Sequence, residues 1–296
     1  MIKHSRLAQT VLHLVFVAVC IACLFPLFLV LGISFTDEDT ISRSGFNLLP
    51  KLVSTEAYRF VLRESDAIGR AYLLTIAVTV VGTLVGTLVV ALYAYPLARA
   101  DFRWRKGFSK FVFFTMLFTG GLVPWYMICV QVLHLRNTFF ALWLPYVMNA
   151  WFVMLMRTFY KENVPVSIVE SARLDGAGEY TIFFRIIVYL AKPGIATIAL
   201  FNTITLWNDW WLPLMLVNDS KWYNLQFLMY RVQSNIQYLS TMASSLSGVS
   251  ADILRRLPSR TAQMAMCVLV MGPIVLAYPF FQRYFVKGIT VGSIKE

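Results

Sequence analysis

The chain has 296 residues, of which 58% are hydrophobic and only 14% are charged. About a quarter of the residues in an ordinary soluble domain are charged, so this composition excludes such a domain and favours a chain that crosses a membrane several times. The net charge of +11 does not indicate a nucleic-acid partner, because the basic residues lie at the ends of apolar runs, where they orient membrane helices.

Six apolar runs approach or exceed the ~20 residues that a helix needs to cross a bilayer. We expect spans at residues 11–33, 71–98, 111–133, 139–156, 194–217 and 261–281. Gly82 and Gly86 in the second run predict close helix packing within the chain, in preference to a dimer contact. Gly120, Gly121 and Pro124 predict a break in the third run, which is tolerated where a helix lines protein or a cavity.

The distribution of charge predicts the orientation of these spans. Six spans place both termini on one side, and that side carries 15 of the 26 Lys and Arg residues in its shorter segments. Positive residues collect in the cytoplasm, so we expect both termini and the polar segment 157–192 to be cytoplasmic.

The polar segment 157–192 predicts two short helices separated by a turn. Pro165 suits the start of a helix over 166–174, because the first turn tolerates a missing N–H. Gly176 suits its end, because glycine accepts the left-handed conformation of a helix stop. Helical spacing of Phe183, Phe184, Ile187 and Leu190 predicts a second helix over 180–190.

No catalytic or energy-converting site is evident in the sequence. There is no glycine-rich phosphate loop, no metal-ligand cluster and no paired carboxylates within a span. Polar groups within the apolar runs are the amides Asn149, Asn202 and Gln263, with Asp209 near the outer end of the fifth run. The amides fit either hydrogen bonds between helices, which we favour, or contact with a transported molecule. A transporter without an ion site or an ATP site takes its energy from a partner.

Within 157–192, a set of residues resembles the EAA loop of binding-protein-dependent ABC importers. The matching residues are Glu170, Ala172, Asp175, Gly176, Ala177, Phe183 and Pro193. Ser171 replaces the usual second alanine, and Tyr189 replaces a common proline, which leaves the path after the second helix open. The resemblance implies the all-α type I importer permease fold with six transmembrane helices. It also implies that residues 170–172 and 175–177 contact an ATPase, while Phe183, Phe184 and Ile187 anchor the loop to the spans.

Two further stretches are similar to carbohydrate permeases of the maltose-importer type. These are LWNDWWLPLML at 206–216 and the end of the chain at 278–296. The similarity implies a subgroup for complex oligosaccharides such as alginate fragments, in a bacterial cell membrane. It implies four kinds of partner: a second permease, an ATPase dimer that holds ATP and Mg, an extracytoplasmic solute-binding protein and an oligosaccharide cargo. This chain itself would bind no cofactor and catalyse no reaction.

The expected organisation has three parts. Residues 1–69 hold the first span and an external segment, residues 70–285 form the transport core, and residues 286–296 form a cytoplasmic tail. The core contains the coupling loop 157–192 and an external segment 218–260. An ion-coupled or facilitative secondary transporter, and a membrane scaffold or receptor, are the alternative functions.

The external segment 218–260 is rich in aromatic residues. Trp222, Tyr223, Phe227, Tyr230 and Tyr238 suit docking of a binding protein or contact with sugar, and equally an amphipathic helix on the outer membrane face. Three arginines, Arg255, Arg256 and Arg260, suit attraction of an acidic partner or plain solvation.

Overall fold

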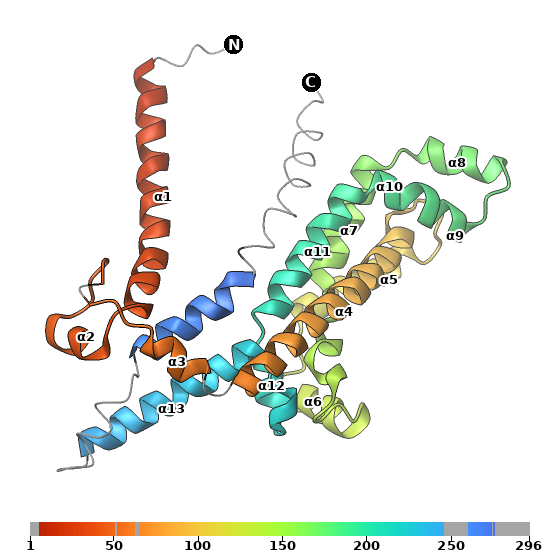
Figure 1. Cartoon of the computed structure of the whole chain (residues 1–296). Helices are drawn as coiled ribbons and strands as arrows, with labels where there is room; N and C mark the ends of the chain where they lie inside the picture. The colour runs from red at the N-terminus through yellow and green to blue at the C-terminus, as the bar shows by residue number, and fades with distance from the viewer. Residues whose placement is uncertain (1–5, 51, 63–64, 246–259, 274, 276–296) are drawn as a thin grey trace. The chain divides into compact units, whose positions relative to one another are not determined.

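The computed structural model describes residues 6–50, 52–62, 65–245, 260–273 and 275, and these residues are mostly helical (Figure 1). Within these ranges the pairing of extended residues is limited to an isolated bridge between Thr36 and Val53. The predicted all-α class is therefore confirmed. The chain divides into two compact units, residues 1–69 with 228–273 and residues 70–227 with 274–296.

The first unit contains a long apolar helix, followed by two short helices. Helix α1 (Arg6–Ser34) has an apolar window of mean hydropathy 3.1, none of which is buried. Helices α2 (Glu38–Ser44) and α3 (Glu56–Leu62) follow, and α13 (Leu225–Ser245) lies mostly in this unit. The Glu38 carboxylate accepts the N–H groups of Arg260 and Thr261 at 3.1 and 2.9 Å, and so caps the helical residues 260–273.

The second unit is a helical assembly built around α4 (Ser65–Ala98), most of which belongs to it. The longer elements that follow are α5 (Arg105–Leu117), α7 (Ala150–Asn163), α8 (Val166–Leu174) and α11 (Lys192–Trp207). The shorter ones are α6 (Leu122–Met127), η1 (Ile128–Val132), η2 (Phe139–Leu142), η3 (Leu144–Tyr146), α9 (Glu179–Ile182), η4 (Phe183–Ile187), α10 (Val188–Leu190), α12 (Trp211–Leu216) and η5 (Ser220–Trp222). In Figure 1, α8 and α9 form one end of this unit, and α6 and α12 lie at the other end.

Two buried clusters hold the second unit together. One joins α4, α7 and α11 with the segment after α8, through residues such as Leu97, Met156, Ile187 and Ile198. The other lies toward α12 and includes Trp143, Leu206 and Leu212. Because α4 contributes to both clusters, it connects the two ends of the unit.

The predicted close packing at Gly82 and Gly86 is confirmed within the chain. A Cβ atom at Gly82 would lie 2.6 Å from a Leu206 methyl and 2.9 Å from the Trp143 Cβ. A Cβ atom at Gly86 would lie 3.3 Å from a backbone oxygen of Val147. These glycines therefore let α11 and the segment before α7 approach α4.

Two described helices are long and apolar enough to cross a membrane, at Gln9–Ser34 and Asp66–Ala98, and they agree with the first two predicted spans. Three bent helix pairs raise the number to as many as five. The third predicted span bends by 113° between α5 and α6, and Gly121 has a φ of +85°, so the predicted break is present. The fourth predicted span bends by 51°.

The fifth predicted span has different bounds from those expected. Helix α11 ends at Trp207, before Asn208 and Asp209, and α12 begins at Trp211. At its other end, α11 joins the preceding helical segment 179–190 at an 83° bend. These two segments together, rather than 194–217, are long and apolar enough to cross a membrane. The sixth predicted span is described only over 261–273 and at 275, and the predicted tail 286–296 lies outside the described residues.

Candidate functional site

The predicted helix over 166–174 is present as α8, and a Schellman motif ends it. The Ala177 N–H donates to the Ala172 carbonyl at 2.9 Å, and the Gly176 N–H donates to the Arg173 carbonyl at 2.9 Å. Gly176 has a φ of +81°, the left-handed conformation that this motif requires. The chain therefore reverses at a defined turn between α8 and α9.

Helix α8 is held on one face and exposed on the other. Val169 and Ala172 are buried against the core, while Glu170, Ser171 and Asp175 are exposed. Two apolar side chains beside the turn are also exposed, Leu174 at 89% and Tyr180 at 80%, and Val166 and Ile168 are exposed in the first turn of α8. A group of exposed apolar side chains of this kind is typical of a surface that meets another protein.

The second predicted helix, over 180–190, departs from α-helical geometry in the middle. Residues 179–182 are α-helical as α9, Phe183–Ile187 form the π-helical segment η4, and α10 ends at Leu190. Phe183 and Ile187 are buried, whereas Phe184 is half-exposed. Two of the three predicted anchor residues therefore lie in the core, and the third does not.

The chain leaves this segment by a bend at Ala191. Pro193 lies in the first turn of α11, and the bend between the two helical segments is 83°. The Lys192 ammonium lies 4.2 Å from the centroid of the Tyr189 ring, a cation–π contact. The chain therefore enters α11 through a bend at Ala191 and a first turn that contains Pro193. Tyr189, which replaces the usual proline, packs against Lys192.

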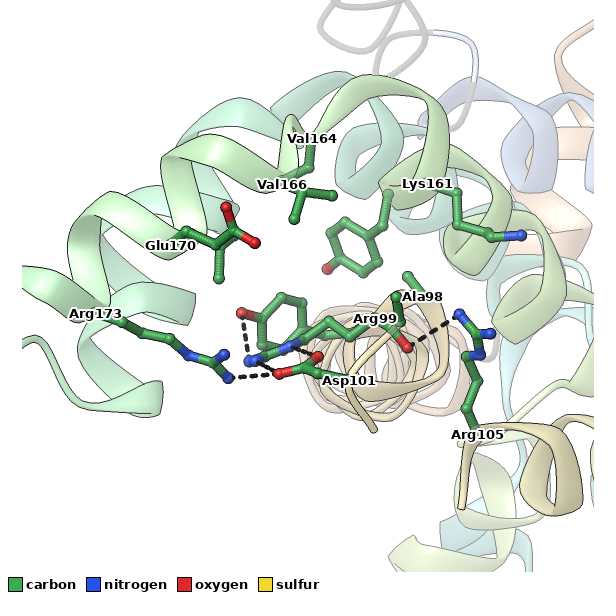
Figure 2. Close-up of a pocket in the computed structure, with 13 residues that line it drawn as sticks. Ala98, Arg99, Asp101, Arg105, Lys161, Val164, Val166, Glu170 and Arg173 are labelled. Atoms are coloured by element: carbon green, nitrogen blue, oxygen red, sulfur yellow. Dashed lines mark hydrogen bonds and ion pairs between the residues drawn. The ribbon is translucent and has the colours of Figure 1, made fainter. Parts of the chain in front are cut away.

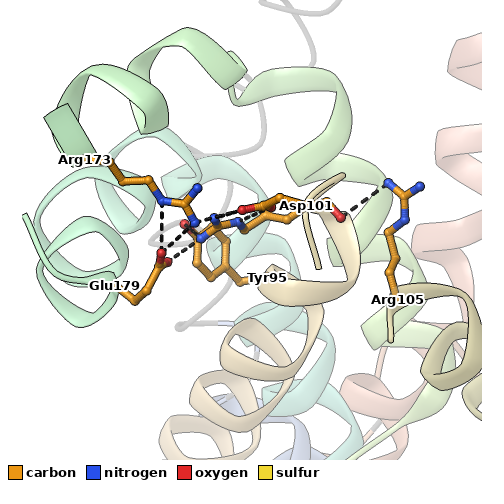
Figure 3. A network of polar contacts seen from close by, with 6 residues as sticks. Tyr95, Asp101, Arg105, Arg173 and Glu179 are labelled. Carbon is orange, nitrogen blue, oxygen red and sulfur yellow. Dashed lines mark hydrogen bonds and ion pairs between the residues drawn. The ribbon is translucent and has the colours of Figure 1, made fainter. Parts of the chain in front are cut away.

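Four charged residues tie the turn to the end of α4 (Figure 3). Arg173 at the end of α8 donates to Glu179 at the start of α9 at 2.7 Å, across the turn. Arg173 also donates to Asp101, which follows α4, at 2.8 Å. Arg99 pairs with both Asp101 and Glu179 and donates to the Tyr95 hydroxyl at 3.3 Å. We call Arg99, Asp101, Arg173 and Glu179 the charged ring.

Electrostatics within the ring favour the ionised forms. The hydrogen bond from Arg99 lowers the pKa of Asp101 below its ordinary value, against the opposing effect of partial burial. Burial opposes the charge of Arg99, but the hydrogen bond to Asp101 and nearby negative charge raise its pKa. The folded-state pKa of Asp101 is depressed, so the stability that Asp101 contributes is present at neutral pH and is lost only in acid.

A cavity of about 320 Å³ lies beside the ring, between α8 and the ends of α4 and α7 (Figure 2). Arg99 and Arg173 are directed toward Asp101 on its lower side in this view. Glu170 and Lys161 also line it, together with apolar residues such as Val166. Helix α8 therefore does not pack tightly along its whole length, and the ring spans the gap beside the cavity.

The ring residues were not predicted from the sequence as part of the site. Arg173 and Glu179 flank the predicted glycine turn with opposite charges, which is a signal for pairing across it. Asp101 follows Arg99 by two residues after a predicted span, which also permits a pair. The contact between these two pairs depends on tertiary structure, and no spacing in the sequence indicates it.

The other predicted candidates are spread over several elements. Asn149 caps α7 by accepting the Trp151 N–H at 2.9 Å, and buried Asn202 donates to the Thr87 hydroxyl on α4 at 3.2 Å. Trp222 and Tyr223 pack beside the cluster near α12, and Tyr230 is partly exposed on α13. Arg260 is exposed, while Arg255 and Arg256 lie outside the described residues. Among the described residues, no group of three or more His, Cys, Asp and Glu could hold a metal ion.

Comparison with solved structures supports the fold. A chain from a bacterial ABC transporter involved in the import of the acidic polysaccharide alginate matches this structure with a TM-score of 0.81. The match covers 96% of this chain and 100% of that chain at 24% sequence identity. At that identity the likeness shows the type I importer permease fold alone.

Comparison with known sequences shows the family. A polygalacturonan/rhamnogalacturonan transport system permease protein, YtcP of Bacillus subtilis, is 33% identical over 98% of this chain and 99% of its own length. The arabinooligosaccharides transport system permease protein AraQ of the same species is 26% identical over the full length of both chains. Residues 91–291, which include α8, the turn and all four residues of the charged ring, match a family of membrane transport subunits. The chain therefore belongs to the family described as binding-protein-dependent transport system inner membrane components.

Proposed function

We propose that this chain is the permease subunit of an ATP-driven, binding-protein-dependent importer, and that α8 and its turn are the part that an ATPase subunit engages. ATP-driven closure of the ATPase dimer then displaces α8, and this displacement switches the transport path between its inward-facing and outward-facing states. Of the residues expected to contact the ATPase, Glu170, Ser171, Asp175 and Gly176 are exposed, Ala177 is partly exposed, and Ala172 is buried on the opposite face of α8, where it holds the helix to the core.

The observation that carries this proposal is the pair of exposed apolar side chains beside a hydrogen-bonded glycine turn at one end of the second unit. Leu174 and Tyr180 stand almost fully exposed beside Gly176. A nine-residue helix is too short to be stable alone in water, since isolated helices below ~12–15 residues are marginal. Its attachment to the core, with one face left open, fits a contact surface for a second protein.

The energy source in this proposal lies on partner subunits. The chain has no glycine-rich phosphate loop of the kind that holds ATP, so ATP and Mg would bind to the ATPase dimer. The charge distribution predicts a cytoplasmic α8, on the side where such an ATPase would be. A second permease and an extracytoplasmic solute-binding protein complete the assembly, and this chain catalyses no step itself.

The proposed cargo is an oligosaccharide. The two relatives are named for the transport of polygalacturonan, rhamnogalacturonan and arabinooligosaccharides, and the solved transporter is involved in the import of alginate. Trp222, Tyr223 and Tyr230 are candidates for docking the binding protein or for contact with sugar. An acidic oligosaccharide is included in the proposal, because alginate is an acidic polysaccharide.

The test replaces the two glycines of the turn in the complete importer reconstituted in proteoliposomes. Gly176→Pro removes the N–H that donates to Arg173 and forbids the φ of +81°, so the turn is lost. Gly178 has a φ of −71° and no atom within 4 Å of a Cβ added there, so Gly178→Ala is the matched control. We expect Gly176→Pro to lower ATP-dependent sugar uptake about tenfold or more, and Gly178→Ala to leave it unchanged.

Normal ATP-dependent uptake by the Gly176→Pro complex would contradict the proposal. Uptake that persists in wild-type vesicles without the ATPase subunits would also contradict it, and would favour an ion-coupled or facilitative secondary transporter.

A further inference from the structure

The contacts of the charged ring are unevenly distributed among its members. Arg173 and Glu179 bridge the two arms of the turn, whereas Arg99 and Asp101 belong to the end of α4 and the residues after it. Arg99 contacts Tyr95, Asp101 and Glu179, and so connects α4 directly to α9. The guanidinium of Arg99 therefore adds a polar link between Glu179 and α4 to the Arg173–Asp101 pair and the buried cluster that also join this region to α4.

Burial distinguishes Arg99 from the other three ring residues. Its side chain is 14% exposed, whereas those of Asp101, Arg173 and Glu179 are 40–53% exposed. Exposed ion pairs are screened by solvent and stabilise little, but a guanidinium that is largely shielded and bonded to several partners holds its geometry better. Arg99 is therefore the one ring residue that is largely shielded from solvent, and the other three are partly exposed.

The end of α4 that carries Arg99 is itself fixed by two other arginines. Arg105 at the start of α5 donates to the Arg99 carbonyl at 3.3 Å, and Arg157 on α7 donates to the Leu97 carbonyl at 3.1 Å. The last carbonyls of a helix have no partners within it, so these side chains satisfy groups that would otherwise need water. The backbone at and next to Arg99 is therefore tied to α5 and α7 by hydrogen bonds.

Farther along, α4 is joined to α11 in the apolar part of the unit. Thr83 and Thr203 hydroxyls lie 3.2 Å apart, and Asn202 donates to Thr87 at 3.2 Å. A displacement of the end of α4 is therefore shared with α11 through direct contacts. By contrast, the covalent route from the turn to α11 passes through the π-helical segment η4 and the 83° bend at Ala191.

We propose that Arg99 is a positioning residue that makes the turn between α8 and α9 move together with α4, so that displacement of α8 reaches the transport path through α4. The inference rests on the proposed function of α8. Without Arg99, Asp101 and Glu179 keep Arg173 as a partner, and the turn keeps its own shape. What is lost is the polar link between Glu179 and the end of α4, while the buried cluster that contains Tyr95 and Ile182 remains, so more of a displacement of α8 is taken up in the segment between α8 and α11.

Geometry also predicts that lysine would not fully take over the role of Arg99. The guanidinium of Arg99 donates to both oxygens of Asp101, to Glu179 and to the Tyr95 hydroxyl. An ammonium group is a compact charge on a flexible stem and does not present this planar set of donors. Arg99→Lys should therefore restore only part of the function that Arg99→Gln loses.

The experiment measures ATP hydrolysis and sugar uptake by the complete importer in proteoliposomes, together with retention of the ATPase subunits. Arg99→Gln is expected to keep the ATPase subunits bound and to keep hydrolysis within about twofold, while uptake per ATP hydrolysed falls about tenfold. Arg99→Lys is expected to fall between wild type and Arg99→Gln. The matched control is Arg103→Gln, because exposed Arg103 lies on the same loop over the Trp104 ring, outside the charged ring.

Either of two results would overturn this inference: wild-type uptake per ATP in Arg99→Gln, or loss of the ATPase subunits from it. A general loss of structure would lower hydrolysis and uptake together. The amount of sugar taken up per ATP hydrolysed therefore distinguishes a lost positioning role from a folding defect. The proposed function fails separately, through normal uptake in Gly176→Pro. If Gly176→Pro abolishes uptake and Arg99→Gln does not lower uptake per ATP, only the role of Arg99 is wrong.

Discussion

Asp209 shows how a single buried carboxylate organises the end of the second unit that lies opposite α8. It is 7% exposed and stands between α11 and α12. Its Oδ1 accepts the Tyr146 hydroxyl at 3.2 Å and the N–H groups of Trp211 and Leu212 at 3.2 and 3.4 Å. Its own carbonyl accepts the Asn224 amide at 2.6 Å. Asp209 therefore accepts the first two N–H groups of α12 and joins this helix to η3.

Substitution of Asp209 tests whether Oδ1 alone carries this structural role. The other oxygen, Oδ2, is buried and has no hydrogen-bond partner among the described residues. Asp209→Asn keeps an acceptor at Oδ1, so we expect the free energy of unfolding to stay within about 1 kcal/mol of wild type. Asp209→Ala removes three accepted hydrogen bonds and should lower it by about 1–3 kcal/mol. Thermal unfolding of the purified protein in detergent measures both, and an equal loss in the two variants would mean that the negative charge itself is required.

At this scale the sequence identified single residues better than their partners. Asp209 was expected near the outer end of the fifth span, and Asn202 was expected to bond between helices, which its contact with Thr87 confirms. The partner Tyr146 lies 63 residues before Asp209, and Thr87 lies 115 residues before Asn202. Contacts over such separations depend on how the helices pack, and a single sequence does not specify that packing.

At the scale of elements, the local stop signals were the reliable part of the prediction. Helix α8 begins after Pro165 and ends before Gly176, as expected. Proline fixes φ and lacks an N–H, and glycine accepts a positive φ, so each residue sets the backbone locally. The π-helical segment η4 was not expected, since helical spacing of Phe183 and Ile187 is compatible with α-helix as well. Its geometry places both side chains in the core, which is a tertiary requirement that overrides the local preference.

Glycine substitutions test the packing of α4 against its neighbours. An added methyl at Gly82 meets the Trp143 Cβ at 2.9 Å, which cannot move without its backbone, so we expect Gly82→Ala to destabilise the protein by about 1–3 kcal/mol. Gly107 lies within α5 and has no atom within 4 Å of an added Cβ. Gly107→Ala should therefore be neutral or stabilising by up to about 1 kcal/mol. Thermal unfolding in detergent compares the pair, and a stable Gly82→Ala variant would contradict the close packing.

At the scale of the whole molecule, composition and hydropathy were sufficient for the class of protein and for the first two spans. They were insufficient for the bends. The 113° and 83° bends lie at Gly120–Gly121 and at Ala191, and only the first carries a glycine signal. Helices at membrane depth break where neighbouring helices or polar groups satisfy the freed backbone, so the second bend depends on packing that composition does not record.

The central claim is that α8 lies in the cytoplasm and binds a partner ATPase. Labelling of single cysteines tests this claim most directly. Ser171 on α8 and Ser220 in η5 are both exposed. Each is replaced by cysteine after Cys20, Cys23, Cys129 and Cys267 have been changed to serine. The reagent is a thiol label that does not cross membranes, applied to intact cells and to inside-out vesicles.

We predict that Ser171→Cys is labelled only in inside-out vesicles, is protected when the ATPase subunits are bound and cross-links to them, while Ser220→Cys is labelled in intact cells. Labelling of Ser171→Cys from outside the cell, or unchanged labelling in the presence of bound ATPase, would contradict the account.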